Sequence, residues 1–332
     1  MLILGVETSC DDTAAAVLLD GRTVLANLVS SQDEIHGPFG GVVPELASRQ
    51  HVRNILPIID GALKKAGIEL KNLDGLAVTC GPGLVGSLLV GLSVAKGLAY
   101  RWGIPYVGVN HLEAHLLAMF LEREVAFPYL SLLASGGHTL LYKVWNFGAY
   151  QYLGGTRDDS AGEAYDKVAK MMGLGYPGGR VIDQLSRSGN PRAVAFPRAR
   201  LKKGSYDFSF SGLKTSFWHY LREQGGDRWE SRKADIAASF QEAVVDMLVG
   251  PTLRAARELA VKRIVLAGGV AANSRLRQKM TEKAQAEGLD IYFPSPAFCT
   301  DNGAMIALCG YHRLKRGHRD DWALNADADL TL

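Results

Sequence analysis

"LILGVETSCDDTAAAVLLDGRTVLANLVSS" (residues 2–31) is the stretch that decides the fold of this chain. Three short apolar runs, at residues 2–8, 13–19 and 23–31, are separated by the polar turns "SCDD" and "DGR". Apolar runs of this length between turn-forming residues predict β-strands. The stretch therefore predicts a meander of three strands.

The same pattern returns in the middle of the chain. Three further strand-like runs, "YLSLLAS", "TLLYKVW" and "QYLGGT", begin at residue 129. Each triplet precedes helical sequence, at 43–67 and 161–173, and later an apolar strand that enters a glycine turn and a helix, at 75–99 and 263–280. This repeat predicts an α/β fold of two duplicated lobes facing across a cleft, with a phosphate-bearing ligand where the turns converge.

The lobes are not expected to be strictly sequential. We assign residues 1–109 and 300–332 to the first lobe and residues 110–299 to the second. The segment at about 160–245 exceeds what the repeat requires, so we predict a mostly helical insertion there. The stretch from about residue 300 is expected to fold back as a helix on the first lobe.

Composition narrows the class of protein. The chain has 332 residues, and none of its apolar runs approaches the ~20 residues of a membrane span. The first residues lack the basic region of a signal peptide, so we expect a cytoplasmic protein without membrane contact. Four scattered cysteines without a CxxC pair argue against a disulfide scaffold.

A net charge of +3 is too mild to indicate nucleic-acid binding by itself, although basic residues gather at 192–203 and 312–319. Each basic run taken singly is interpreted as a solvated surface.

Glycine-rich turns give the second signal. "GPGLVG" (81–86) fits the dinucleotide fingerprint, but no acidic residue follows in 101–110 to hold a ribose, so we interpret these glycines as close backbone packing. No P-loop motif occurs. "ASGGH" (134–138), "YPGGR" (176–180) and "AGGVAAN" (267–273) expose backbone N–H groups, and the third opens a helix. Together these three turns predict a nucleotide cleft.

"NHLEAH" (110–115) places His111 and His115 four residues apart, on one face of a helix. Such a pair can hold a metal ion, and the alternative is a hydrogen-bonded pair in the core. Glu113 lies about 200° around the helix from either histidine and is expected to face away from any metal. It therefore lacks the position of the general base in a zinc protease.

Many motifs of the chain, in order, carry a resemblance to a known family. They are "GVETSCDDT", "GGVVPELASRQH", "GPGLVGSLLVG", "NHLEAH", "ASGGHT", "AGEAYDKVAK", "YPGG", "FSFSGLKT", "AGGVAANSRLR" and "CTDNGAMIA". These motifs resemble the bacterial tRNA threonylcarbamoyladenosine transferases, members of the actin, hexokinase and heat-shock ATPase superfamily. The resemblance runs from residue 5 to about 307.

The resemblance implies an acyl transfer to tRNA. A threonylcarbamoyl group would pass from threonylcarbamoyl-adenylate to N6 of the adenosine just 3′ of the anticodon, in tRNAs that read codons beginning with A, with release of AMP. It also implies one divalent metal ion, iron(II) first and zinc as the alternative. The implied partners are a smaller paralogous subunit and a small P-loop ATPase.

The resemblance also implies the site residues. The metal ligands would be His111, His115 and Asp301, with Asp11 as a possible catalytic residue. The donor would bind Leu133, Ala134, Ser135, Gly136, Gly137, Asp166, Gly179, Asp183 and Asn273. Simpler roles stay open: Asp301 and Asn273 as helix caps, and Asp166 and Asp183 as solvated acids. "ASGGH" departs from the family pattern by an alanine where valine is common.

Three other functions stay open at this point. The fold also suits a nucleotide-binding scaffold that only regulates partners. A metallopeptidase is disfavoured by the position of Glu113. A sugar or acetate kinase of the same superfamily gives no reason for two histidines in the cleft.

Overall fold

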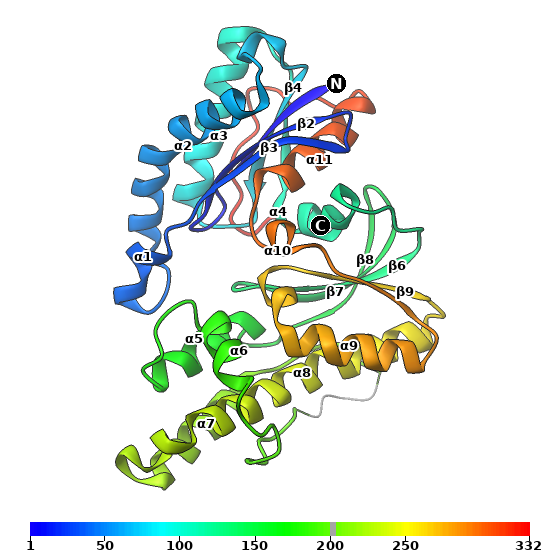
Figure 1. Cartoon of the computed structure of the whole chain (residues 1–332). Helices are drawn as coiled ribbons and strands as arrows, with labels where there is room; N and C mark the ends of the chain where they lie inside the picture. The colour runs from blue at the N-terminus through cyan, green and yellow to red at the C-terminus, as the bar shows by residue number, and fades with distance from the viewer. Residues whose placement is uncertain (200–203) are drawn as a thin grey trace. The chain divides into compact units, whose positions relative to one another are not determined.

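The computed structural model describes residues 1–199 and 204–332, which divide between two compact units (Figure 1). Unit 1 comprises Met1–Val125 and Pro294–Leu332, and unit 2 comprises Ala126–Phe293. The chain thus leaves unit 1 later, and returns to it earlier, than the boundaries expected at 109 and 300. The helices α4 (His111–Leu117) and η3 (Ala118–Leu121) belong to unit 1 because α11 (Gly303–Lys315) packs against both.

Unit 1 is built on a five-stranded sheet in the order β3-β2-β1-β4-β5. Its strands are β1 (Leu2–Glu7), β2 (Thr13–Leu19), β3 (Thr23–Ser30), β4 (Gly75–Gly81) and β5 (Tyr106–Asn110). β1 pairs antiparallel with β2 and parallel with β4, and β2 pairs antiparallel with β3. The meander predicted for residues 2–31 is therefore confirmed.

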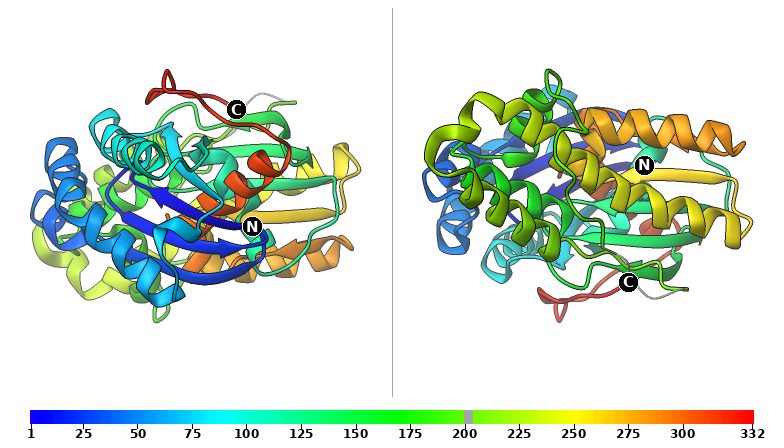
Figure 2. Two further views of the ribbon diagram at one scale, coloured as in Figure 1. Left: turned by 90° about the horizontal axis from the view of Figure 1, so that it is seen from above. Right: turned by 90° about the horizontal axis from the view of Figure 1, so that it is seen from below.

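Both faces of this sheet are covered by helices (Figure 2). Leu4 and Val6 of β1 join the buried cluster with Ile55 of α2 (Pro44–Ala66) and Leu92 of α3 (Val85–Trp102). Gly5, between them, lies against α11. Because successive residues of a strand face opposite sides, α2 and α3 cover one face and α11 covers the other. The expected return of the chain as a helix on the first lobe is confirmed.

Unit 2 repeats the same topology. Its sheet has the order β10-β9-β6-β7-β8. Its strands are β6 (Tyr129–Ala134), β7 (Thr139–Asn146), β8 (Ala149–Gly155), β9 (Arg263–Ala267) and β10 (Asp290–Tyr292). β6 pairs antiparallel with β7 and parallel with β9, as β1 does with β2 and β4. The duplication predicted from sequence is confirmed, whereas β5 and β10 were not predicted because both are short.

The helices of unit 2 gather beside its sheet (Figures 1 and 2). They are α5 (Ala161–Met171), α6 (Gly178–Ser186), α7 (Ser211–Gln224), η4 (Gly226–Arg232), α8 (Lys233–Glu258), η5 (Gly269–Ala272) and α9 (Ser274–Ala286). The segment predicted as a helical insertion at about 160–245 is mostly helical, and α8 continues beyond it. The short elements α1 (Asp33–His36), η1 (Gly37–Phe39), η2 (Leu70–Asn72) and α10 (Pro296–Cys299) complete the fold. Among the residues described, no helix has the length and apolar character needed to cross a membrane.

Candidate functional site

Helix α4 carries the two histidines singled out from the sequence. Asn110 ends β5 and caps this helix, because its Oδ1 accepts hydrogen bonds from the N–H groups of Leu112 at 2.8 Å and Glu113 at 3.2 Å. An asparagine is a favoured residue at this position, so the helix begins at His111. His111 and His115 consequently lie one turn apart on the same face.

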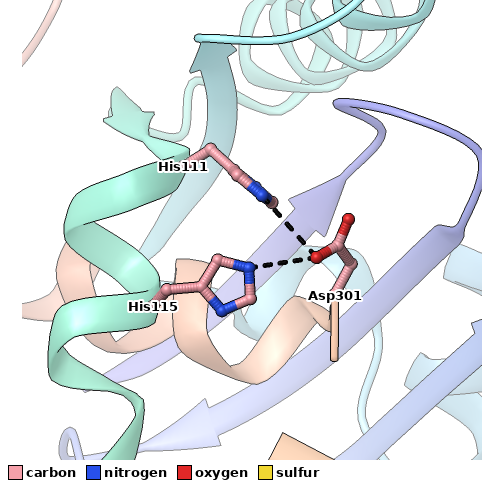
Figure 3. A group of neighbouring side chains, drawn as sticks. All are labelled: His111, His115 and Asp301. Atoms are coloured by element: carbon pink, nitrogen blue, oxygen red, sulfur yellow. Dashed lines mark hydrogen bonds and ion pairs between the residues drawn. The ribbon is translucent and has the colours of Figure 1, made fainter. Parts of the chain in front are cut away.

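Asp301, between α10 and α11, completes a cluster with these histidines (Figure 3). Its Oδ1 lies 3.0 Å from Nε2 of His115 and 3.6 Å from Nε2 of His111. One ligand atom from each of the three residues lies within 4.8 Å of the others. Ligands at about 2.0–2.1 Å around a tetrahedral ion stand about 3.3 Å apart, so the residues present fit a divalent ion.

The alternative role considered for Asp301 is wrong. Asn302, the next residue, caps α11, with its Oδ1 accepting a hydrogen bond from the N–H of Met305 at 3.0 Å. The carboxylate of Asp301 is thus turned toward the histidines instead of the end of the helix (Figure 3).

A buried carboxylate stands behind His111. Glu7 is fully buried at the end of β1, and its Oε2 lies 3.0 Å from Nδ1 of His111. The same oxygen accepts a hydrogen bond from the hydroxyl of Thr79 at 2.6 Å, and the hydroxyl of Ser9 lies 3.1 Å from Nδ1. A carboxylate on Nδ1 fixes the tautomer in which Nε2 presents its lone pair to a metal. Sequence reasoning missed this role, although an acid that ends an apolar strand is a detectable signal.

The carboxylates of the cluster shift the pKa values of the groups around them. Burial alone would lower the pKa of His111, but Glu7 and Asp301 raise it to about 9. Burial first, and then the charge of Asp301, raise the pKa of Asp11 and bring the pKa of Asp12 to about 8. Carboxylates that repel one another in a buried site favour a bound cation. The structure thus places Asp11, the candidate catalytic residue, in the electric field of the proposed metal ligand.

Glu113 faces away from this cluster, as predicted. Its Oε2 lies 2.5 Å from Nη2 of Arg313 on α11, and Nη1 of the same arginine donates a hydrogen bond to the carbonyl of Gly108 at 2.7 Å. The glutamate is therefore held in a buried ion pair and is not placed to act as a base beside the histidines.

The proposed donor-binding turns lie in unit 2. Leu133 and Ala134 are buried at the end of β6. Ser135, Gly136 and Gly137 follow in the turn to β7, and both glycines are exposed. The carbonyl of Ser135 accepts a hydrogen bond from the N–H of Gly162 at 3.2 Å, so the turn rests on the first residues of α5.

Two of the remaining predicted residues link α5 to the start of α6, and α6 to the start of α9. Oδ1 of Asp166 on α5 accepts a hydrogen bond from the N–H of Gly178 at 2.8 Å, next to Gly179 at the start of α6. Oδ1 of Asp183 accepts from the hydroxyl of Ser274 at 2.7 Å, at the start of α9. The two acids are thus hydrogen-bonded and not simply solvated.

Asn273 occupies the N-cap of α9, which confirms the simpler role considered for it. Its Oδ1 accepts a hydrogen bond from the N–H of Leu276 at 2.9 Å. Its Nδ2 donates to Oε1 of Gln241 at 2.7 Å and lies 3.5 Å from the hydroxyl of Tyr165, which is buried. Gln241 and Tyr165 were not predicted, because their contacts with Asn273 join segments far apart in the chain, although Tyr165 lies within the motif "AGEAYDKVAK".

Comparison with known proteins decides the family. The chain matches the family described as tRNA N6-adenosine threonylcarbamoyltransferase over residues 23–308. The chain belongs to this family. A tRNA N6-adenosine threonylcarbamoyltransferase from Syntrophotalea carbinolica is 53% identical, over 100% of this chain and 97% of that protein. One from Anaeromyxobacter dehalogenans is 55% identical, over 98% of each.

Solved structures of more distant proteins agree with this threonylcarbamoyltransferase on the fold alone. HypF in a phosphate- and nucleotide-bound form superposes with a TM-score of 0.62 at 14% identity, over 97% of this chain and 56% of that chain. The ROK hexokinase from Thermus thermophilus gives a TM-score of 0.50 at 16% identity, over 96% of this chain and 100% of that chain. The duplicated α/β fold predicted from the sequence is therefore shared with these proteins.

Proposed function

We propose that this threonylcarbamoyltransferase family member moves a threonylcarbamoyl group from threonylcarbamoyl-adenylate to N6 of the adenosine just 3′ of the anticodon. The observation that carries the proposal is the identity of more than half of all residues with full-length tRNA N6-adenosine threonylcarbamoyltransferases. The adenosine amine forms a bond to the carbamoyl carbon, and the bond from this carbon to the phosphate oxygen breaks. AMP leaves with the electron pair, and the amine loses a proton.

The donor is a mixed anhydride that is already activated, so the reaction needs no protein nucleophile. The protein must position two substrates, polarise the carbonyl and exclude water. The position of Glu113 agrees with a reaction of this kind, because Arg313 holds this carboxylate away from the histidines.

His111, His115 and Asp301 would hold one divalent ion. We propose iron(II), because two histidines with one carboxylate are a ligand set typical of this ion, and keep zinc as the alternative. When bound, the ion supplies a Lewis acid with open coordination positions for oxygen atoms of the donor. Glu7 and Ser9 keep the imidazole of His111 oriented toward that ion. Asp11 is proposed to orient water or the ion.

The adenylate half of the donor is assigned to unit 2. Gly136 and Gly137 are exposed in a turn that rests on the start of α5, and the hydrogen bonds of Asp166 and Asp183 tie the starts of α6 and α9 to the helices before them. Helix N-termini favour anions such as phosphate. We propose that these two acids accept hydrogen bonds from the ribose and that Asn273 contacts the base or ribose edge.

Contacts with tRNA are assigned to the basic residues of the 192–203 stretch. Arg192 is exposed, and Arg198 is paired with Asp246 at 2.9 Å. Arg200, Lys202 and Lys203 lie outside the described residues. We expect that replacing Arg198 and these three residues by glutamate weakens tRNA binding and reduces its salt dependence, while AMP binding is unchanged. Unchanged tRNA affinity at low and moderate salt would remove this surface from the proposal.

The proposal also includes the setting and the partners of the reaction. We propose a smaller paralogous subunit and a small P-loop ATPase as partners, and a reducing cytoplasm, where the four free cysteines stay reduced.

Mass spectrometry of tRNA nucleosides tests the function. Unmodified tRNA, synthetic threonylcarbamoyl-adenylate and the partner proteins are incubated with the parent protein or with His115→Ala, and the metal content of each is measured. The parent should produce threonylcarbamoyladenosine, and His115→Ala should lose most of both metal and product. No product with the parent would refute the transfer, and full product with metal-free His115→Ala would refute the role of the metal. A regulatory scaffold would lose the metal in His115→Ala without any change in tRNA modification.

A further inference from the structure

The tail segment (residues 316–332) follows α11 and covers the free edge of the unit 1 sheet. Oδ2 of Asp320 accepts a hydrogen bond from the N–H of Gly108 at 2.7 Å, and the N–H of Asp320 donates to the carbonyl of Tyr106 at 3.0 Å. The ring of Trp322 lies 5.4 Å from that of Tyr106 and 5.8 Å from that of Tyr100. The tail segment is thus fixed along β5, the strand that leads directly into the metal helix α4.

Further along, the tail segment binds the turn "GPG" (81–83). The N–H of Asp327 donates to the carbonyl of Cys80 at 2.8 Å, and the N–H of Gly83 donates to the carbonyl of Ala328 at 3.2 Å. A Cβ atom at Gly81, whose φ is +157°, would lie 2.0 Å from the carbonyl oxygen of Asp327. Only glycine fits there, so this part of the "GPGLVG" motif serves the docking of the tail segment.

The opposite side of the same turn touches a residue at the metal site. A Cβ atom at Gly83 would lie 2.4 Å from the carbonyl oxygen of Ser9, which also accepts a hydrogen bond from the N–H of Leu84 at 2.8 Å. The hydroxyl of Ser9 lies 3.1 Å from Nδ1 of His111. The turn therefore connects the tail segment to His111 through Ser9.

Asn110 makes a second and more direct connection. Its amide oxygen caps α4, and its Nδ2 donates hydrogen bonds to the carbonyls of Leu330 and Thr331, each at 3.3 Å. The side chain is buried, and the two acceptor and two donor interactions use the hydrogen-bonding capacity of one amide. One side chain thus joins the tail segment to the first turn of the helix that begins with His111.

We propose that the tail segment is a strap that positions the metal site, with Asn110 as its positioning residue. Helix α4 has seven residues, too few for stability by itself, so its first turn depends on its cap. Release of the strap frees the Asn110 amide to rotate and loosens His111, which lowers the affinity of the site for a divalent ion. The inference rests on the proposed function only in that it takes this cluster as a metal site.

Two variants test the strap. Deletion of residues 330–332 removes both acceptors and leaves Asn110 in place. Asn110→Asp keeps an oxygen to cap α4 and removes the donor to the tail segment. Thr331→Ala is the matched control, because Asn110 donates to the backbone carbonyl of this residue, which alanine keeps. Titration with Zn²⁺ and with Co²⁺ measures the affinity, and hydrogen exchange of the Leu112 and Glu113 amides reports on the cap in the metal-free protein.

We expect roughly tenfold weaker Zn²⁺ and Co²⁺ binding in the deletion variant and in Asn110→Asp, as for other residues that orient metal ligands. The two amides should exchange faster in the deletion variant, AMP binding should not change, and Thr331→Ala should behave like the parent. Because both changes break the same link, the combined variant should bind Zn²⁺ about as weakly as the weaker single variant.

The outcomes separate the strap from the metal site itself. A parent protein that binds neither Zn²⁺ nor Co²⁺ would overturn the metal site, and the strap with it. Tight binding by the parent together with unchanged affinity in both variants would overturn the strap alone. If the deletion variant does not fold, Asn110→Asp and its Zn²⁺ affinity decide the matter.

Discussion

Glu113→Gln is the change that best separates a structural glutamate from a catalytic one. The carboxylate of Glu113 is 7% exposed and lies 2.5 Å from the guanidinium of Arg313, whose side chain is 34% exposed. Glutamine keeps an acceptor for Arg313 and removes the charge. Arg313 stays charged, so the change removes only the attraction between opposite charges, which lies between the about 0–1 kcal/mol of an exposed pair and the about 3–5 kcal/mol lost on breaking a buried one. We therefore expect the free energy of unfolding to fall by about 1–2 kcal/mol.

Calorimetry and the nucleoside assay measure the two consequences of this change. A loss of about 1–2 kcal/mol corresponds to a Tm lower by roughly 2–8 °C for a unit of this size. Metal content and threonylcarbamoyl transfer should equal those of the parent, because the side chain faces away from His111 and His115. Glu124→Gln is the matched control: its pair with Arg22 is exposed on both sides, so its Tm should change little.

The reasoning would be refuted by a Glu113→Gln protein that keeps the parent Tm and loses metal or transfer. That result would place Glu113 in the reaction and revive the peptidase interpretation. The peptidase would then be established if the parent cleaved a protein substrate and the variant did not.

Three further predictions concern the binding site and stability. Asp166→Ala and Asn273→Ala should each weaken AMP binding in a calorimetric titration, and parent-like binding in both variants would contradict the assignment to unit 2. Asn273→Ala should also lower the unfolding free energy by about 1 kcal/mol because it removes a helix cap. Glu7→Gln should weaken Zn²⁺ binding by about 10–100-fold in a metal titration, because the charged partner of His111 is lost, and an unchanged affinity would contradict this role. Hydrogen bonds from Arg275 hold the pKa of Glu242 at about 2, below its ordinary value of 4.5. The carboxylate of Glu242 therefore contributes about 3 kcal/mol to the free energy of unfolding above pH 4.5, and this contribution is lost as the pH falls toward 2. Glu242→Gln should therefore lower stability at pH 7 and converge with the parent at low pH in denaturant titrations, and a difference that does not depend on pH would count against the ion pair.

The sequence by itself determined the duplicated architecture. The spacing of apolar runs and turns at 2–31 and again at 129–156 fixes which segments form strands, because period and turn chemistry are local properties of a chain. The pair His111 and His115 was visible for the same reason, since a helix brings positions four apart onto one face. The orientation of Glu113 followed from the same geometry.

Only the tertiary structure decided what surrounds these residues. Glu7 and Asp301 lie 104 and 190 residues from His111 in the chain, and the fold of unit 1 brings both to its imidazole. Whether Asp301 or Asn302 caps α11 could not be decided from the sequence, because both residues favour that position. The contacts of Asn110 with the tail segment were equally hidden, since they are made to backbone carbonyls, which every residue carries. Local patterns specify helices and strands, whereas contacts between distant segments depend on how the whole chain packs. For that reason the helix that carries His111 and His115 was predictable, while the residues that orient it were not.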